Sequence, residues 1–533
     1  MKSRIIILTI LLSSYSVSTV FSQKKALNTI TESDLEAHLE FIASDLLEGR
    51  ETGDPGLVIA SQYIQSNIKR IGLKSMNNNS SYLQDMDMLW ITSDFENTWL
   101  KGINDQSELV FRNDSVICPI PYFLNTELEG EVVFAGYGYR NDEEDYNDFE
   151  GLDLNGKIVM IMSRTPKNFR DKSEDVTTFF NERKEGPKFI HALQNGAKAI
   201  LWVFDPDNIY ESFYEFGDLS YFDNTFFLAD EAPQASPASF VFITRHTADL
   251  ILKSTGYTLA ELQHQIDSEN KPVSQPVNGI NLNIKLEKKV KDFTSYNVVG
   301  IIEGSDPVLK NECVVYTAHY DHAGLDGKGN VFNGADDNGS GTVGLLEIAE
   351  AYMSLSKPPK RSIVFVWCTA EEKGLYGSKY YTMHPAYPLE QTVININLDM
   401  IGRIKTEADT GKVLFYDIDV KGKDGLFVYT GKQSSDLIHI NETACQKLDL
   451  IADYDGEQTH LYSSDQYHFY ENGIPVLFYH TGIHTDLHQI TDEVSKISYA
   501  KMKRVCQLAF SVGYEAANRS KRIEVDNPID SEE

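Results

Sequence analysis

Apolar residues recur at helical spacing in the N-terminal part of the chain. Leu35, Leu39 and Ile42 repeat every three to four residues after Thr31, a residue type that caps helices. A second amphipathic pattern covers residues 57–71, beyond the helix-breaking run GRETGDPG. Two helices are therefore expected before residue 72, followed by irregular structure over residues 77–123, where the pattern is mixed.

From residue 124 the chain reads as short strands with one helix. The predicted strands cover 131–139, 157–163, 197–204 and 240–244, and the helix covers 188–195. Between Phe204 and Glu231 lie nine aromatic and eight acidic residues. Two interpretations of this excursion stay open: a surface loop packed by its own aromatic side chains, or a lid or wall of a substrate site.

After Ser295 short β-branched runs alternate with helical stretches. The expected strands are 297–302, 313–318, 363–369, 393–398 and 476–480, and the helices between or after them include 342–355 and 501–517. The strands show no period of two, which is typical of strands buried on both faces. The prediction is an α/β fold with a mixed, mainly parallel sheet flanked by helices.

Charge and cysteine content exclude several classes of function. The chain has 533 residues, of which 48 are Lys or Arg and 79 are Asp or Glu, giving a formal charge of −31. Nucleic acid would repel such an anion, so no nucleic-acid partner is expected. The five cysteines cannot form a dense disulfide framework, and their odd number leaves at least one thiol unpaired.

The first residues have the pattern of a secretory signal. Lys2 and Arg4 precede an apolar run over residues 5–12, and small residues lead to an expected cleavage site before Gln23. The run is shorter than the ~20 residues of a membrane span, which disfavours an uncleaved anchor. We therefore expect a signal peptide at 1–22, export to the periplasm or outside the cell, and a soluble mature chain without a membrane span.

Candidate metal ligands follow the predicted strands. Carboxyl ends of parallel strands meet at one edge of a sheet, where ligands bind in open α/β folds. One further acid, Asp337, lies in the run GADDNGSG that opens a helix. The residues at the strand ends are His319, Asp321, Glu371, Glu372, Asp399, His484, Asp486 and His488.

Imidazoles and carboxylates without nearby thiolates suit zinc, with manganese or cobalt as alternatives. The ligands exceed what one tetrahedral site uses, so two ions sharing a carboxylate are expected. Asp321 is placed to orient the His319 imidazole. Of the neighbours Glu371 and Glu372, one is expected to bind metal and the other to act as a general base.

Five motifs make the chain resemble a known enzyme family. AHYDHAG, NGADDNGSG, CTAEEKGLYGS, NLDMIGR and GIHTDLHQITD resemble the metal-site motifs of co-catalytic, di-zinc aminopeptidases related to bacterial leucyl aminopeptidase, aminopeptidase Y and glutamate carboxypeptidase. The middle of the chain, with GYGY, GLDLNGKIV and NGAKAILW, resembles the protease-associated domain that many members carry as a β-rich insertion.

The resemblance implies a role for each site residue. His319 and Asp399 match the terminal ligands of one zinc, Glu372 and His488 match those of the other, and Asp337 matches the bridging carboxylate. Asp321 matches the partner of His319, and Glu371 matches the general base. The family has a cis peptide bond after the residue matching Asp337. The roles are carried here by His319, Asp321, Asp337, Glu371, Glu372, Asp399 and His488.

Two positions differ from, or lie outside, the family pattern. Many relatives have Tyr where this chain has Leu487, so an oxyanion contact from that position must be absent or supplied elsewhere. His484 is a candidate substrate contact or a loop cap, and both interpretations stay open. Side-chain preference and oligomeric state are not predictable from these motifs.

The resemblance implies an exported zinc aminopeptidase acting on peptides with a free N-terminus. The alternatives are a carboxypeptidase or dipeptidase of the same superfamily, a glutaminyl cyclase, and a non-catalytic binding protein. A terminal carboxylate would need cations, for which Arg50 and Arg403 are the candidates. The expected order is a signal peptide (1–22), the N-terminal part of the peptidase domain (23–123), the protease-associated-like insertion (124–287), the catalytic domain (288–520) and a polar tail (521–533).

Overall fold

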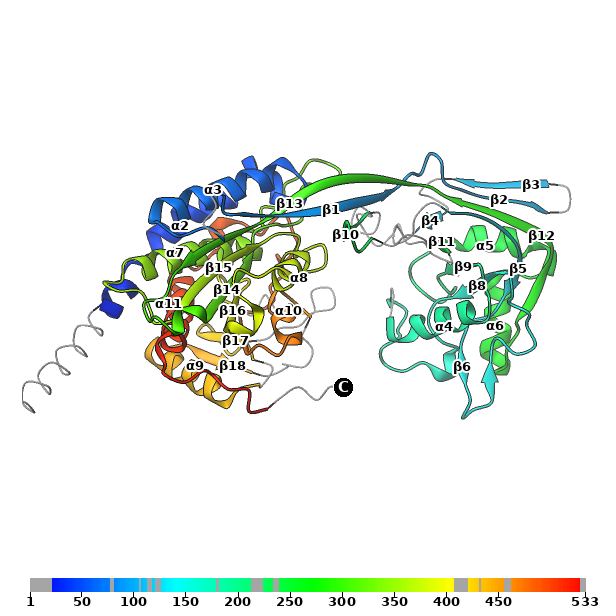
Figure 1. Cartoon of the computed structure of the whole chain (residues 1–533). Helices are drawn as coiled ribbons and strands as arrows, with labels where there is room; N and C mark the ends of the chain where they lie inside the picture. The colour runs from blue at the N-terminus through cyan, green and yellow to red at the C-terminus, as the bar shows by residue number, and fades with distance from the viewer. Residues whose placement is uncertain are drawn as a thin grey trace, which may run out of the picture. The chain divides into compact units, whose positions relative to one another are not determined.

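The chain forms two compact units. The first contains the residues up to Asp87 together with those from Phe293 onward, and the second, here called the inserted unit, covers Met88–Asp292. The predicted signal peptide, apart from Ser22, lies outside the described residues. The computed structural model (Figure 1) describes residues 22–76, 81–104, 107–112, 117–119, 126–178, 182–211, 224–232, 239–406, 420–430, 433–454 and 462–527.

A mixed sheet forms the centre of the first unit. Its strands lie in the order β1-β13-β15-β14-β16-β19-β17-β18, and the part of β1 within the inserted unit also pairs with β10. The neighbours β15, β14, β16 and β19 run parallel to one another, whereas β13 is antiparallel to β15 and β17 is antiparallel to β19. The edge strand β18 runs parallel to β17. The strands are β1 (Leu83–Ser93), β13 (Lys288–Ile302), β14 (Cys313–His319), β15 (Ser362–Cys368), β16 (Thr392–Leu398), β17 (Gly425–Tyr429), β18 (Ile451–Asp453) and β19 (Val476–His480).

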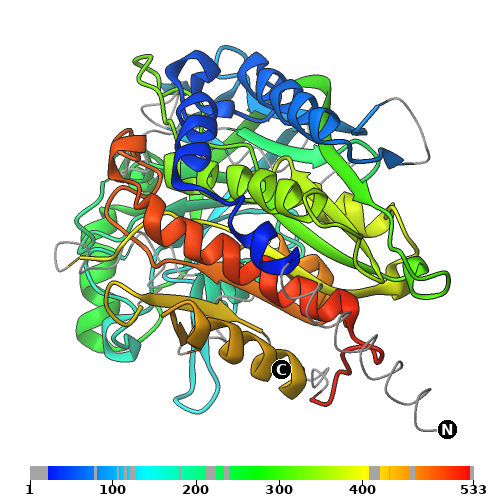
Figure 2. The same cartoon turned by 90° about the vertical axis from the view of Figure 1, so that its left-hand side faces the viewer.

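Helices cover both faces of this sheet, which explains why its strands are apolar throughout. Val314 and Tyr316 of β14 belong to one apolar core with residues of α2, α3, α7, α9 and α11, and these helices lie together in Figure 2. Cys313 and Val315, on the opposite face, pack with residues of α8 and α10. The helices are α2 (Glu32–Ile42), α3 (Pro55–Ile71), α7 (Gly341–Met353), α8 (Tyr376–Met383), α9 (Ser435–Lys447), α10 (Gln466–Glu471) and α11 (Tyr499–Asn518).

The first helix begins as its sequence predicts. The Thr31 side chain accepts a hydrogen bond from the backbone N–H of Asp34, which caps α2, while Leu35, Leu39 and Ile42 form its buried face. Short 3₁₀ helices connect the longer elements. They are η1 (Asp45–Arg50), η7 (Leu309–Asn311), η9 (Leu389–Gln391) and η12 (Val494–Lys496).

The inserted unit is β-rich, with an eight-stranded sheet in the order β3-β2-β12-β5-β8-β9-β11-β4. Helices α5 and α6 share one core with this sheet. Its strands are β2 (Trp99–Asn104), β3 (Ser107–Arg112), β4 (Ile117–Pro119), β5 (Thr126–Phe134), β8 (Ile158–Met162), β9 (Ala199–Val203), β11 (Ser239–Ile243) and β12 (Gln275–Leu286). The other elements are β6 (Arg140–Asn141), β7 (Tyr146–Asn147), β10 (Asn224–Leu228), η3 (Lys167–Phe169), α4 (Glu182–Gln194), α5 (Arg245–Leu252), η6 (Lys253–Thr255) and α6 (Leu259–Glu269).

The expectation of irregular structure over 77–123 is wrong. Strands β1 to β4 lie there, and in β1 the exposed Asp85 and Asp87 alternate with the buried Met86 and Met88. The acidic residues interrupt the apolar pattern because they face solvent. The inserted unit begins at Met88, and the domain boundaries expected from the sequence stay predictions.

Two further expectations concern the thiols and the aromatic excursion. Cys313, Cys368, Cys445 and Cys506 are buried and unpaired. The odd number of cysteines had predicted at least one unpaired thiol.

Residues 212–223 of the aromatic excursion lie outside the described residues, so both interpretations of the excursion stay open. Among the helices that the structure describes, none is both long and apolar enough to cross a membrane.

Candidate metal centre

The parallel strands bring the predicted ligands to one edge of the sheet. His319 is the last residue of β14, Asp399 follows β16 directly, and Glu371 and Glu372 follow β15 after two residues. His488 lies in the loop after β19. Because β15, β14, β16 and β19 are parallel, these side chains leave the sheet at the same edge.

Asp337 reaches this edge from the turn η8 (Ala335–Ser340), which precedes α7. The buried Asp492 carboxylate holds the turn, because its Oδ2 accepts the backbone N–H of Asp336 and of Asp337, each at 3.0 Å. The peptide bond between Asp337 and Asn338 is cis, as the resemblance implied.

The first ligand cluster contains His319, Asp337 and Asp399, all buried. His319 Nε2 lies 3.5 Å from Asp337 Oδ1 and 3.3 Å from Asp399 Oδ1. The three potential ligand atoms lie within 4.8 Å of one another, close enough to surround one ion.

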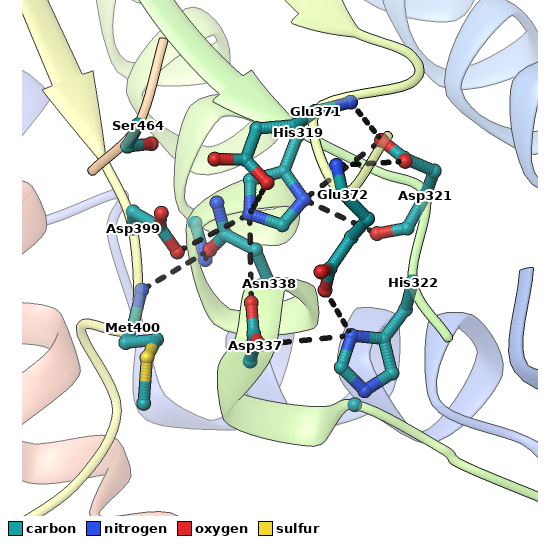
Figure 3. Close-up of polar contacts among 12 residues, drawn as sticks. His319, Asp321, His322, Asp337, Asn338, Glu371, Glu372, Asp399, Met400 and Ser464 are labelled. Atoms are coloured by element: carbon teal, nitrogen blue, oxygen red, sulfur yellow. Dashed lines mark hydrogen bonds and ion pairs between the residues drawn. The ribbon is translucent and has the colours of Figure 1, made fainter. Parts of the chain in front are cut away.

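The second cluster contains His322, Asp337 and Glu372, and it lies at the other oxygen of Asp337. The predicted ligand His488 lies beside this cluster. Asp337 Oδ2 lies 3.1 Å from His488 Nε2 and 3.7 Å from His322 Nδ1. Glu372 separates its two oxygens in the same way, with Oε2 at 3.2 Å from His488 Nε2 and Oε1 at 2.8 Å from His322 Nδ1. Figure 3 shows Asp337 between His319 and His322, so one carboxylate is shared by both clusters.

This donor set fits zinc. Imidazole nitrogens and carboxylate oxygens are ordinary zinc ligands, and neither cluster contains a thiolate. A carboxylate that offers one oxygen to each cluster is the arrangement expected for two neighbouring ions.

Glu371 lies beside the first cluster but belongs to neither. Its Oε2 is 3.8 Å from His319 Nε2. Burial, with the carboxylates of Asp399 and Glu372 adding to it, raises the pKa of Glu371 well above its usual value. Burial also acts to raise the pKa of Glu372, but the imidazoles of His488 and His322 hold that pKa well below its usual value. The two neighbouring acids thus occupy contrasting electrostatic environments.

Asp321 contacts His319 mainly through its backbone. His319 Nδ1 lies 3.1 Å from the Asp321 carbonyl oxygen and 3.9 Å from its carboxylate. The carboxylate instead accepts the backbone N–H of Glu371 through Oδ1 at 3.1 Å and that of Glu372 through Oδ2 at 3.3 Å. Figure 3 shows Asp321 facing both amides.

The comparison with known families agrees with this geometry. Residues 297–512, which carry all of these ligands, match peptidase family M28. We call residues 297–512 the M28 region, after the family model that they match. The M28 region begins in β13 and ends in α11, and it excludes the N-terminal helices α2 and α3.

Among the relatives of this chain is aminopeptidase YwaD of Bacillus subtilis (strain 168), which is 30% identical over 247 residues, or 44% of this chain and 48% of the relative. The chain spans about half the length of the curated relatives it matches. A solved aminopeptidase from Aneurinibacillus sp. strain AM-1 shares the fold with a TM-score of 0.58 and 21% identity, over 95% of this chain and 98% of the other. BSAP, a zinc aminopeptidase from Bacillus subtilis, has a TM-score of 0.50 and 20% identity over 93% and 98%.

Two candidates from the loop of the M28 region after β19 do not join the clusters. His484 is buried, and its Nε2 lies 3.1 Å from Asp336 Oδ2. This contact with Asp336 was not predicted; the sequence left open a substrate contact or a loop cap. Asp486 accepts hydrogen bonds from Arg403, Thr491 and Lys496. Leu487 is buried in the apolar cluster around β19, so no polar group lies at the position where relatives have Tyr.

His322 lies within AHYDHAG but is not among the predicted site residues. Its contact with Glu372, 50 positions away in the sequence, depends on how two loops meet and has no local sequence signal. Arg50, predicted only as a possible contact for a carboxylate, is fully buried and donates to backbone carbonyls.

Proposed function

We propose that the chain is a zinc-dependent aminopeptidase that hydrolyses the N-terminal peptide bond of peptides. The observation that carries the proposal is the carboxylate of Asp337 shared between two ligand clusters, with Glu371 beside them and outside both. The M28 match and the aminopeptidase relatives support the same reaction class. His319 and Asp399 would hold one ion, Glu372 and His488 the other, and Asp337 both.

Two zinc ions bound by these residues would polarise the scissile carbonyl and acidify a water molecule. Glu371 would accept the proton of the attacking water and return it to the leaving amine. The acidic surroundings, with Asp399 and Glu372 nearby, favour a substrate that carries an α-ammonium group.

The alternatives lack support from particular residues. A carboxypeptidase needs a cation for the terminal carboxylate, but the Arg50 guanidinium is enclosed by backbone carbonyls and Arg403 pairs with Asp486. A glutaminyl cyclase uses one zinc, whereas the two clusters here suit two ions. A binding protein without activity would be expected to lack ligands, and each expected ligand is present.

Kinetics on matched substrates test the proposal. The zinc-loaded protein should cleave aminoacyl anilides with a free amine, lose that activity to a chelator, and regain it with zinc. N-blocked anilides and peptides blocked at the C-terminus form the control panel. Cleavage of the N-blocked substrates at equal rates would exclude an aminopeptidase, and one bound ion per chain in metal analysis would exclude the two-ion site.

Export is part of the same proposal. It rests on the charged start, the apolar run over 5–12 and the small residue before Gln23. N-terminal sequencing of the protein secreted by its own cells should begin at Gln23, and recovery with Met1 would contradict export by cleavage.

The inserted unit is β-rich, and this is the one property that it shares with the expected protease-associated domain.

A further inference from the structure

A short N-terminal segment, Gly49–Thr52, lies directly on the loop that follows β14. The backbone N–H of Gly324 donates to the Gly49 carbonyl at 3.0 Å, and that of His322 donates to the Arg50 carbonyl at 3.1 Å. Gly49 has a φ of +70°, and a Cβ there would lie 2.2 Å from the Gly324 oxygen. Only glycine allows this approach, so the segment is fixed against the loop by backbone contacts.

Arg50 connects the two chain segments that carry His319 and Asp337. Its guanidinium is fully buried and donates to the carbonyl of Tyr320, next to His319, at 2.9 Å. It also donates to the carbonyls of Asn333 at 2.8 Å and Gly334 at 3.0 Å, which lead into the turn of Asp337. The planar donor fork thus sets the spacing between both segments.

Thr52 completes the segment by contacting the carboxylate of Asp321. Thr52 Oγ1 donates to Asp321 Oδ2 at 3.0 Å, and both residues are fully buried. The same carboxylate accepts the backbone N–H of Glu371 and of Glu372, and the Asp321 carbonyl faces His319 Nδ1. One buried carboxylate, fixed by one hydroxyl, therefore sets the position of the base and of a zinc ligand.

We propose that Thr52 is a positioning residue for the reaction, acting through Asp321 on Glu371 and Glu372. The inference rests on the proposed function and adds a residue from outside the M28 region. Thr52 is linked to the ligand clusters through the Asp321 carboxylate. Without its hydroxyl, the Asp321 carboxylate can rotate within its buried site, and the two amides that it holds lose their fixed position. Small displacements of catalytic groups reduce rates strongly.

The test uses Thr52→Val, which keeps the size of the side chain and removes the hydroxyl, and Thr52→Ser, which keeps the hydroxyl. Thr382→Val is the matched control, because Thr382 is also buried in the first unit and its hydroxyl donates to a carbonyl of its own helix, that of Lys379. For Thr52→Val we expect kcat on aminoacyl anilides to fall about 10-fold with KM changed less than about twofold, and zinc affinity to fall about 10-fold.

Thr52→Ser should recover both kcat and zinc affinity to within about threefold of the wild type, and Thr382→Val should change neither. If Thr52→Val does not fold, Thr52→Ser is compared with Thr52→Ala, since these two differ by the hydroxyl alone. Equal behaviour of Thr52→Val and Thr382→Val, or failure of serine to recover the loss, would overturn the inference. A wild type that binds zinc but cleaves no aminoacyl substrate would instead refute the proposed function, and the zinc affinities would still test Thr52.

Discussion

At the scale of single residues, the site depends on carboxylates whose two oxygens have different partners. Asp337 directs Oδ1 to His319 and Oδ2 to His488. Glu372 directs Oε1 to His322 and Oε2 to His488. Each of these carboxylates fixes the distance between the two groups that its oxygens contact, which a side chain with a single ligand atom cannot do.

Replacing Glu371 with Gln should separate catalysis from metal binding. Glu371 faces His319 but lies outside both clusters, so Glu371→Gln should keep two zinc ions while kcat falls by a factor on the order of 10²–10⁴. Metal analysis and steady-state kinetics measure both quantities. Loss of one ion from the variant would mean that Glu371 is a ligand, with Glu372 as the base.

Removing the His322 imidazole should weaken one ion only. His322 donates toward Glu372 Oε1 and leaves Oε2 for the metal, so His322→Ala should lower the affinity for the second ion by about 10–100-fold. The first ion, at His319 and Asp399, should remain. Zinc titration of the metal-free forms measures this, with the exposed His384 replaced by Ala as control. Unchanged affinity in His322→Ala would show that His322 does not support Glu372.

At the scale of elements, helix α7 links the metal turn to the N-terminal helices. It begins directly after the turn of Asp337, and its buried Glu347 accepts the backbone N–H of Thr31 at 3.3 Å, at the start of α2. Glu347 Oε1 also lies 3.9 Å from His38 Nε2. Burial, aided by the carboxylates of Asp34 and Glu350, raises the pKa of Glu347 to about 8.

This pKa makes the contact between α2 and α7 sensitive to pH. The pKa of Glu347 is about 8 in the folded state and about 4.5 in the unfolded state, so the folded state binds the proton more tightly. The contribution of Glu347 to folding stability therefore falls as pH rises from about 4.5 to about 8. Glu347→Gln cannot ionise, so it does not lose stability as pH rises, and its amide oxygen can still accept the backbone N–H of Thr31. The Tm of the variant should therefore exceed that of the wild type by more at pH 8 than at pH 5.

Calorimetry at the two pH values, with metal loading held constant, measures this difference. Glu515→Gln is the control, since it removes an exposed carboxylate, on α11. A Tm difference between Glu347→Gln and the wild type that is equal at pH 5 and pH 8 would contradict the assignment.

At the scale of the whole molecule, the first unit holds the complete candidate site. Every described cluster residue lies in it, and β1 is next to β13 where the chain leaves for the inserted unit. The hydroxyl of Thr294 donates to Asp87 Oδ1 at 3.1 Å, and the N–H of Val299 donates to the Tyr82 carbonyl at 2.8 Å. These contacts fit an antiparallel pair that a tight turn can close.

Replacing residues 88–292 with an Asn-Gly turn should therefore leave a folded unit that binds zinc. Its activity on small aminoacyl anilides should persist within about 10-fold, because the ligands and their supports are retained. If the excursion Phe204–Glu231 forms a substrate wall, selectivity among longer peptides should be lost; if it packs only on itself, anilides and pentapeptides should respond alike. Circular dichroism, zinc content and kcat/KM measure these outcomes, and an insoluble or zinc-free product would refute an independent first unit.

The sequence by itself determined the α/β core and the ligand residues. Strands buried on both faces need apolar residues throughout, and carboxyl ends of parallel strands meet at one edge, so β14, β15, β16 and β19 and the acids after them were predictable. The helices α2, α3, α7 and α11 followed from their apolar spacing. The motif resemblance added which acid is shared.

Only the tertiary structure decided the supports of the site. Thr52 contacts Asp321 across 269 positions of sequence, and His322 meets Glu372 across 50 positions, so no local pattern marks either pair. The burial of Arg50 likewise depends on carbonyls from distant loops. Periodicity reports which side of an element is apolar, whereas these hydrogen bonds depend on how loops from separate elements meet, and that is set by packing.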